Sequence, residues 1–156
     1  MAHQHYKGTG NIHSFRGLLA DGAEDRIRIQ GPVGSIAWRI TKFQIISTAP
    51  GVASTESIVQ IFRETQSSPS ATVDFTNDEL LGVAYSSEGA SVASPGYETI
   101  IFDNALFSRN IFVSYNSTEG STACNYYIEL EEVKVSAAGM AQLAVAASRR
   151  GYVPGT

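Results

Sequence analysis

The sequence predicts an all-β protein, a β-sandwich or jelly-roll-like domain of about eight strands with one short C-terminal helix. Short runs of alternating apolar and polar residues recur along the chain, turn residues separate them, and no crossover helix is predicted between them. With 156 residues, the chain has the size of one domain. We expect an N-terminal arm and first edge segment over residues 1–24, a β-sandwich over 25–135, and a helix with an extended tail over 136–156.

The first clearly alternating strand is predicted over residues 25–30, where Ile27 and Ile29 alternate with Arg26 and Arg28. Alternate side chains of a strand point to opposite faces, so the isoleucines turn toward the core and the arginines toward solvent. The formal net charge of −4 argues against a general nucleic-acid-binding protein, which normally carries a basic stripe. We therefore expect no direct nucleic-acid partner.

The next strand is predicted over residues 35–47, and its apolar pattern changes phase part-way along. Trp38 and Ile40 share one face, but Phe43 and Ile45 fall on the other if the strand is regular. Because a slip of one residue moves every later side chain to the opposite face, the strand needs a β-bulge near Thr41 and Lys42. The alternative is a bend at which the strand passes from one sheet to the other.

The remaining strands repeat these signals with two variations. Residues 58–63 are apolar on both faces, which is typical of a central strand or of a face covered by a partner. The last strand changes phase at Glu131 and Glu132, as the earlier one does near Thr41. These strands are predicted over residues 58–63, 72–75 (a short strand or a turn), 80–85, 97–102, 110–115 and 126–135.

A single helix is predicted after Ser136, which is a good N-cap residue. Met140, Leu143, Ala144 and Ala147 follow helical spacing, and Gly151 is placed to end the helix. An apolar stripe made of such small residues cannot hold an isolated helix together. We expect the helix to dock on its own sheet or on a neighbouring subunit.

Composition limits the compartment and the kind of surface. Charged residues make up 17% of the chain, against about 25% in typical globular domains, so the surface is polar but weakly charged. No apolar run approaches the roughly 18 residues that a membrane-spanning helix requires, and the first residues lack the apolar core of a secretory signal. The one cysteine, Cys124, permits no intrachain disulfide. We expect synthesis in a cytoplasm and no membrane partner.

The residues that carry chemistry form no recognisable catalytic or metal-binding pattern. His3, His5 and His13 lie early in the chain without a fixed cysteine or carboxylate to complete a metal site. Nothing in the surroundings of Cys124 marks an activated thiolate, and a small buried residue is the simpler interpretation. The candidate carboxylates for a catalytic pair are Asp74, Asp78, Glu79 and Asp103, but Asp78 and Glu79 fall in a turn, and sequence alone brings no two of the four to the required separation. We predict no catalytic, cofactor-binding or metal-binding residues and no enzymatic activity.

Three runs carry a resemblance to a known group of proteins: ATVDFTNDELLG at residues 71–82, IFDNALF at 101–107 and NYYIELE at 125–131. Over residues 25–135 the chain resembles small virion structural proteins of tailed bacteriophages, especially marine ones. The resemblance implies a β-sandwich or jelly roll that sits on or in the particle, with termini that reach neighbouring subunits.

These observations together predict a capsid decoration or cement subunit that bridges neighbouring capsid proteins in the virion. Its expected partners are the major capsid protein or other virion proteins, and we expect a homo-oligomer. The partner contacts are predicted in the two terminal segments, at His3, His5, Tyr6, Arg149, Arg150, Tyr152 and Val153.

Two alternatives remain open at this stage. One is another virion part: a coat jelly roll, or a neck, tail or fibre-base component. The other is a carbohydrate-binding module for host adsorption, which exposed Trp38 together with several tyrosines on one face would favour. A buried Trp38 would favour the structural role instead.

Overall fold

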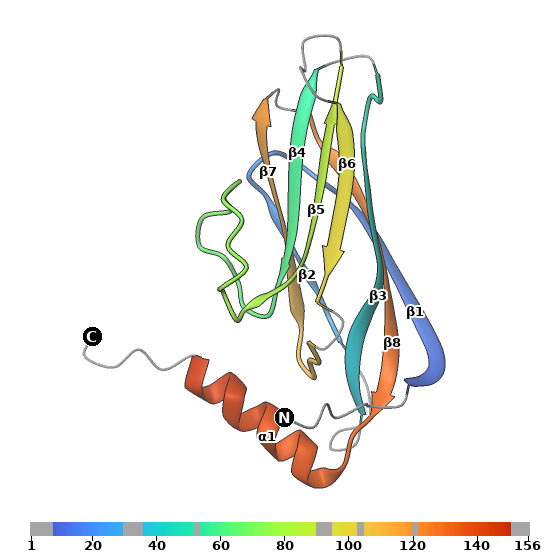
Figure 1. Ribbon diagram of the computed structural model, residues 1–156, viewed down its shortest axis with the longest axis vertical. Helices are drawn as coiled ribbons and strands as arrows, with labels where there is room; N and C mark the ends of the chain where they lie inside the picture. Colours follow the sequence, from blue (N-terminus) through green and yellow to red (C-terminus); the bar gives the residue numbers. More distant parts are fainter. Residues whose placement is uncertain are drawn as a thin grey trace, which may run out of the picture.

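The computed structural model describes residues 8–29, 36–51, 54–89, 95–102, 105–119 and 122–150. Within these ranges two antiparallel sheets face each other as a sandwich, with one helix at the lower end (Figure 1). The three-stranded sheet has the order β1-β8-β3, and the five-stranded sheet has the order β2-β7-β4-β5-β6. The elements are β1 (Gly8–Leu19), β2 (Glu24–Ile27), β3 (Ile36–Ser47), β4 (Thr55–Phe62), β5 (Leu80–Glu88), β6 (Gly96–Ile101), β7 (Ile111–Glu119), β8 (Cys124–Lys134) and α1 (Ala137–Arg150). The predicted all-β sandwich with a C-terminal helix is confirmed.

The main core lies between the two sheets and is built from their inward-facing side chains. Trp38 is 4% exposed, and its backbone bridges to Phe107, whose carbonyl accepts a hydrogen bond from the Trp38 N–H at 2.7 Å. The fully buried positions come from both sheets, so neither sheet can form its hydrophobic face without the other. The largest of them are Tyr115, Leu19, Ile61, Leu81, Ile111, Ile128 and Leu130.

The β-bulge predicted in the second strand is confirmed at Thr41 of β3. Ile40 pairs with Leu130 of β8 and Lys42 with Glu129, so Thr41 is an extra residue without its own partner. Its hydroxyl donates a hydrogen bond to the Glu129 carbonyl at 3.2 Å. Because of the inserted residue, the apolar side chains before and after the bulge point to the same face of the sheet, and all of them reach the same core.

The change of phase in β8 has a different cause from the one expected. β8 pairs with β3 without interruption from Leu130 to Lys134, so no extra residue is inserted between them. The buried face changes instead, because a second apolar cluster covers the outer face of the sheet at this end. It consists of Ala37, Leu106, Val133 and Val135, with Met140 and Leu143 of α1 packed against it.

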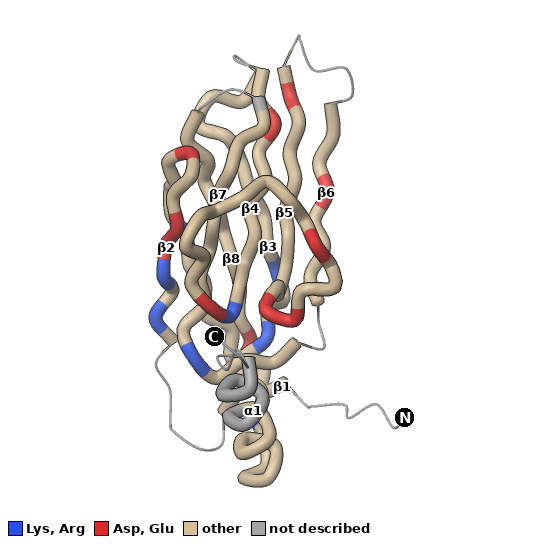
Figure 2. The backbone as a smooth tube through the Cα atoms, turned by 90° about the vertical axis from the view of Figure 1, so that its left-hand side faces the viewer, with Lys and Arg blue, Asp and Glu red and all other residues tan. Residues whose placement is uncertain are grey.

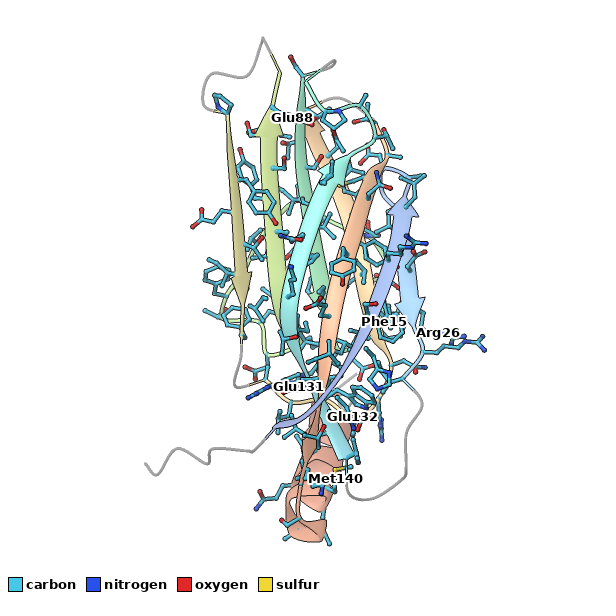
Figure 3. The ribbon with its side chains drawn as sticks, turned by 90° about the vertical axis from the view of Figure 1, so that its right-hand side faces the viewer. Phe15, Arg26, Glu88, Glu131, Glu132 and Met140 are labelled. Carbon is cyan, nitrogen blue, oxygen red and sulfur yellow. The ribbon has the colours of Figure 1, made fainter. Side chains whose placement is uncertain are left out.

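The same cluster decides where α1 docks. Met140 and Leu143 lie against the chain's own sheet, which fulfils the first of the two docking modes expected for this helix. The predicted N-cap is present, since the Ser136 Oγ accepts a hydrogen bond from the Gly139 N–H at 3.1 Å. The label of Met140 in Figure 3 marks the helix below the end of the sheet.

The chain itself covers the outer face of the central strand β4. The loop over residues 63–79 folds back beside β4 (Figure 1). The Gln60 side-chain amide donates to the carbonyl oxygens of Ser70 and Thr72 at 3.0 and 3.1 Å, and Asn116 of β7 donates to the Pro69 carbonyl at 3.1 Å. Both faces of β4 are therefore apolar because it is a central strand with a folded loop on its outer side.

Residues 72–75 form part of this loop and not a strand, so of the two alternatives predicted for them, a short strand or a turn, the structure has the second. The alternation of Val73 and Phe75 with polar residues suggested a half-buried strand. Both side chains are exposed, by 40% and 54%, and Asp74 turns the chain by accepting hydrogen bonds from the Thr76 N–H and hydroxyl at 2.9 and 2.6 Å. A side-chain turn of this kind competes with strand pairing.

Strand β1 lies within residues 1–24, for which an arm and a first edge segment were expected without strand bounds. It pairs with β8 from Leu19 opposite Cys124 to Ile12 opposite Glu131, and Gly8 lies opposite Val133. Residues 8–10 were expected to belong to a polar arm, but they form the start of this strand. At Gly17 a Cβ would lie 2.6 Å from the Tyr126 hydroxyl oxygen, so the absence of a side chain there makes room for the tyrosine ring.

We expect Trp38→Ala to lower the free energy of unfolding by about 3–5 kcal/mol, because it removes a large, almost fully buried side chain and leaves a cavity. Denaturant unfolding of the purified protein measures the change. Phe75→Ala is the matched control, since that ring is more than half exposed and its removal should cost much less. Equal losses in the two variants would contradict the core position of Trp38.

Candidate functional site

The outer face of the three-stranded sheet, which is turned toward the viewer in Figure 3, carries the candidate surface. Side chains along each strand point alternately to the inner and the outer face of the sheet. The register of the three strands therefore decides which outward-facing side chains lie next to one another in a row. One outward row is Leu18–Asn125–Ile46, and the next is Arg16–Tyr127–Gln44. Each row takes one side chain from β1, one from β8 and one from β3.

A shallow groove of about 520 Å³ runs over these two rows. Leu18 and Ile46 stand on either side of Asn125 and are 57% and 62% exposed, so this face presents two large aliphatic side chains to solvent. The groove is lined by Arg16, Gly17, Gln44, Ile46, Asn125, Tyr126 and Tyr127. The surface thus combines apolar side chains with amide, phenol and guanidinium groups, and it can contact a partner by both kinds of interaction.

Within the described residues, the side chains of Arg16, Gln44 and Asn125 form no hydrogen bond or ion pair with another residue. Neighbouring groups on the same face are already engaged. The Tyr127 hydroxyl donates to Glu129 at 2.8 Å, and this hydrogen bond raises the pKa of the tyrosine. The Arg39 Nε donates to Glu131 at 2.8 Å. The groove therefore presents donors and acceptors that stay available to a partner.

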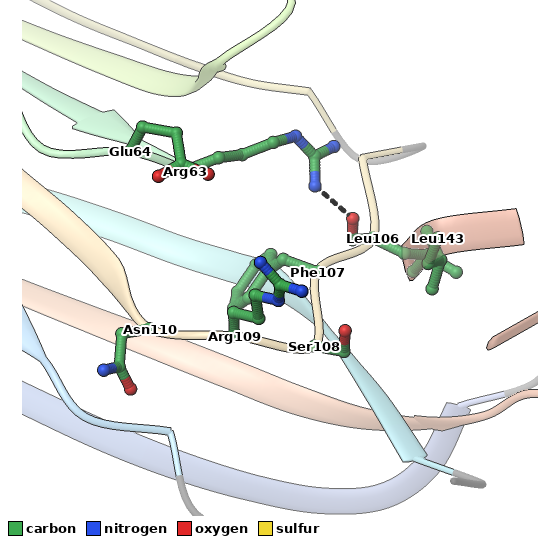
Figure 4. A pocket seen from close by; sticks show the side chains of 8 residues that line it. All are labelled: Arg63, Glu64, Leu106, Phe107, Ser108, Arg109, Asn110 and Leu143. Atoms are coloured by element: carbon green, nitrogen blue, oxygen red, sulfur yellow. Dashed lines mark hydrogen bonds between the residues drawn. The ribbon is translucent and has the colours of Figure 1, made fainter. Parts of the chain in front are cut away.

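A second, much smaller pocket lies where α1 meets the sheets (Figure 4). Its volume is about 30 Å³, which is enough for a water molecule but not for an organic ligand. Arg63 donates a hydrogen bond to the Leu106 carbonyl, and Asn110 accepts one from the Ile29 N–H at 2.9 Å. These contacts join the ends of β4, β2 and β7 to the base of the sandwich, and they make the pocket a structural junction.

The predicted partner-contact residues are not tested by this structure. His3, His5, Tyr6, Tyr152 and Val153 lie outside the described residues. Arg149 and Arg150 are the last residues of α1, but their side chains also lie outside the described part. The groove residues could not be selected from the sequence, because polar side chains at alternate strand positions are the normal pattern of any solvent-facing sheet.

The other residues considered for chemistry have structural surroundings. His13 contacts Glu132 through its Nε2 at 3.1 Å, and its ring meets Trp38 edge-on with centroids 4.9 Å apart. The hydrogen bonds from Thr76 lower the pKa of the Asp74 carboxyl, which holds the turn. Among the described residues, no three His, Cys, Asp or Glu side chains lie together in a way that could hold a metal ion.

Cys124 is 1% exposed, which agrees with the interpretation as a small buried residue. Burial raises the pKa of its thiol to about 11, the opposite of what an activated nucleophile requires. Burial also raises the pKa of Tyr126, whose hydroxyl donates to Asp25 at 3.0 Å. These protons stay in place in the folded protein at pH values where an unfolded chain begins to lose them.

Comparison with known proteins adds no assignment. No protein family matches the chain, and no curated protein matches it either. In the part of the chain that the structure describes, no helix is both long and apolar enough to cross a membrane.

We expect the protein to lose stability as the pH rises from about 9 to 11. Below pH 9 the Cys124 thiol is protonated in the folded and in the unfolded protein. Above pH 9 this thiol ionises in the unfolded protein but not yet in the folded one, so the free energy of unfolding falls. Denaturant unfolding at about pH 8 and pH 10.5 measures the loss. Cys124→Ala should reduce the difference between the two pH values, and rapid alkylation of the folded wild type at pH 8 would contradict the buried, protonated thiol.

Proposed function

We propose that this chain is a structural subunit of a tailed-phage particle, a decoration or cement protein that binds neighbouring capsid proteins through the outer face of its three-stranded sheet. The observation that carries the proposal is the exposed pair Leu18 and Ile46 on the two sides of Asn125, beside a groove that is lined by Ile46 together with Asn125 and other polar residues. Protein interfaces combine apolar centres with hydrogen-bonding groups in this way. The resemblance of residues 25–135 to phage virion proteins supports the particle as the setting.

The low content of charged residues supports a binding partner that is recognised through short-range contacts. With 17% charged residues, the chain has little long-range charge with which to attract a distant partner. Shape, apolar contact and hydrogen bonds must then supply the affinity. Such contacts are weak when taken singly, but many copies on one particle make the binding durable.

A saccharide-binding role is the second candidate, because Gln44, Asn125 and Tyr127 line the same groove. Carboxamides and an aromatic ring can contact the hydroxyl groups and the apolar face of a sugar. Trp38 counts against this role, since it is 4% exposed and lies in the core, away from any surface platform. A glycan array with the purified protein separates the two candidates.

We expect the double variant Leu18→Asp/Ile46→Asp to lose binding to capsid particles while it stays folded, because both side chains are more than half exposed. Cosedimentation with particles that lack the subunit measures the binding. Val73→Asp is the matched control: its side chain is 40% exposed, but it lies on the loop beside the other sheet. Undiminished binding of the double variant would refute this face as the contact.

The place in the particle follows from the copy number, which quantitative mass spectrometry of purified virions measures. Hundreds of copies are expected for a decoration subunit, because such a protein follows the lattice of the shell. A small multiple of six or twelve would instead indicate the neck or tail. Absence of the protein from purified virions would refute the virion role altogether.

A further inference from the structure

Charged residues are unevenly distributed over the outer face of the five-stranded sheet. The two edge strands of this sheet, β2 and β6, lie on its opposite sides. In Figure 2, Lys and Arg colouring gathers along the lower part of the β2 side, below Asp and Glu colouring on the same side, whereas β6 and the loop beside it carry Asp and Glu colouring. One molecule therefore carries a basic edge and an acidic edge on the same sheet.

The basic edge consists of Arg26, Arg28 and Arg109, all of them exposed. The hydrogen bond between the Ile29 N–H and Asn110 brings the chain after β2 against the start of β7, which places Arg28 and Arg109 near each other. Among the described residues, none of these three arginines forms an ion pair. Their charge is thus available to a partner.

The carboxylates closest to this edge in the sequence are held by other groups. Glu24 accepts hydrogen bonds from the Thr65 hydroxyl and the Gln66 N–H at 2.6 and 2.7 Å. Asp25 accepts one from the buried Tyr126 hydroxyl. Both reduce the positive potential of the edge, but neither is bound to one of its arginines.

The acidic edge consists of Glu98 on β6 together with Asp74 and Asp78 on the loop, and all three are exposed. An apolar contact accompanies the charges. Phe75 is 54% exposed and meets Phe102 edge-on, with ring centroids 5.4 Å apart, and Phe102 directly follows β6. The edge therefore offers an exposed aromatic side chain on the same loop as two exposed carboxylates, an arrangement that suits a surface carrying arginines.

Both edges are free of strand partners within the described residues. β6 pairs with β5 and β2 pairs with β7, each on one side only. Four strand spacings separate them, roughly 19 Å at the usual distance between neighbouring strands. One molecule can therefore use its two edges at the same time, each for a different neighbour.

We propose that copies of this chain associate head to tail, with the acidic edge of one copy against the basic edge of the next. The contact deepens the proposed function, on which it rests, by naming a lateral partner for a subunit present in many copies. Because the two surfaces differ, the contact is heterologous, and its repetition gives a ring or an open chain. A two-fold contact between two β6 edges is disfavoured, because it would bring the carboxylates of both copies together.

The charges also predict how the association responds to salt. The chain has a formal net charge of −4, so two copies repel at long range and attract only where opposite edges face each other. Exposed charges are largely screened beyond about 10 Å at 0.1 M salt. We expect self-association that weakens by about tenfold or more between roughly 0.05 and 0.5 M salt.

Charge reversal tests the proposal on the free protein by sedimentation velocity. Arg26→Glu/Arg28→Glu makes both edges acidic, and Asp78→Lys/Glu98→Lys makes both edges basic. Each variant alone should be monomeric where the parent associates, whereas an equimolar mixture should associate again because unlike edges can meet. Lys42→Glu is the matched control, an exposed charge change on the other sheet that should leave self-association unchanged.

A parent that stays monomeric at low salt, a single variant that associates like the parent, or a mixture that fails to associate would overturn the inference. Circular dichroism and melting temperatures of the variants separate a lost contact from a lost fold. The proposed function is tested separately by Leu18→Asp/Ile46→Asp, because these residues lie on the other sheet. This variant should lose particle binding and keep the self-association of the free protein. If charge variants that no longer self-associate still bind the particle as well as the parent does, the lateral contact is not required in the particle.

Discussion

The antiparallel pairing of β3 with β8 is the constraint on which the rest of the structure depends. β8 is the central strand of the three-stranded sheet, and β3 must match it while inserting one extra residue at Thr41. That residue allows Trp38 and Phe43 to enter the same core from the two sides of the bulge. Without it, a regular strand would turn one of these rings toward solvent. The same continuous pairing carries Val133 to the outer face, where α1 covers it.

How much of this arrangement could be predicted depends on where the apolar side chains lie. The bulge was predictable because large apolar residues stand on both sides of it, and the helix was predictable from the Ser136 N-cap and the spacing of its apolar residues. The bounds of β1 were not predictable, because Gly17 and His13 occupy inward positions where alternation would require apolar residues. Gly17 is there to make room for the Tyr126 ring, a requirement that is set by a strand more than 100 residues later in the chain.

The loop over residues 63–79 and the candidate surface were missed for related reasons. The apolar character of β4 on both faces predicted a cover but not its source, since hydrogen bonds from Gln60 to loop carbonyls leave no pattern in a sequence. The groove beside Asn125 is formed by β1, β8 and β3 together, and neither the bounds of β1 nor its pairing with β8 was predicted. The register places Leu18 and Ile46 on either side of Asn125, so the apolar pair becomes visible only after folding.

The two proposed contacts use different parts of the sandwich, and this separation has an energetic consequence. A lateral contact between the edges of the five-stranded sheet would hold neighbouring copies close together, which raises the effective concentration of each copy over the capsid. The contact through the three-stranded sheet could then be weak for a single molecule and still hold an array. Because the edges act through screened charges and the groove acts through apolar contact, salt should weaken the array chiefly through its lateral links. A subunit of this design would leave the particle as single copies once those links are lost.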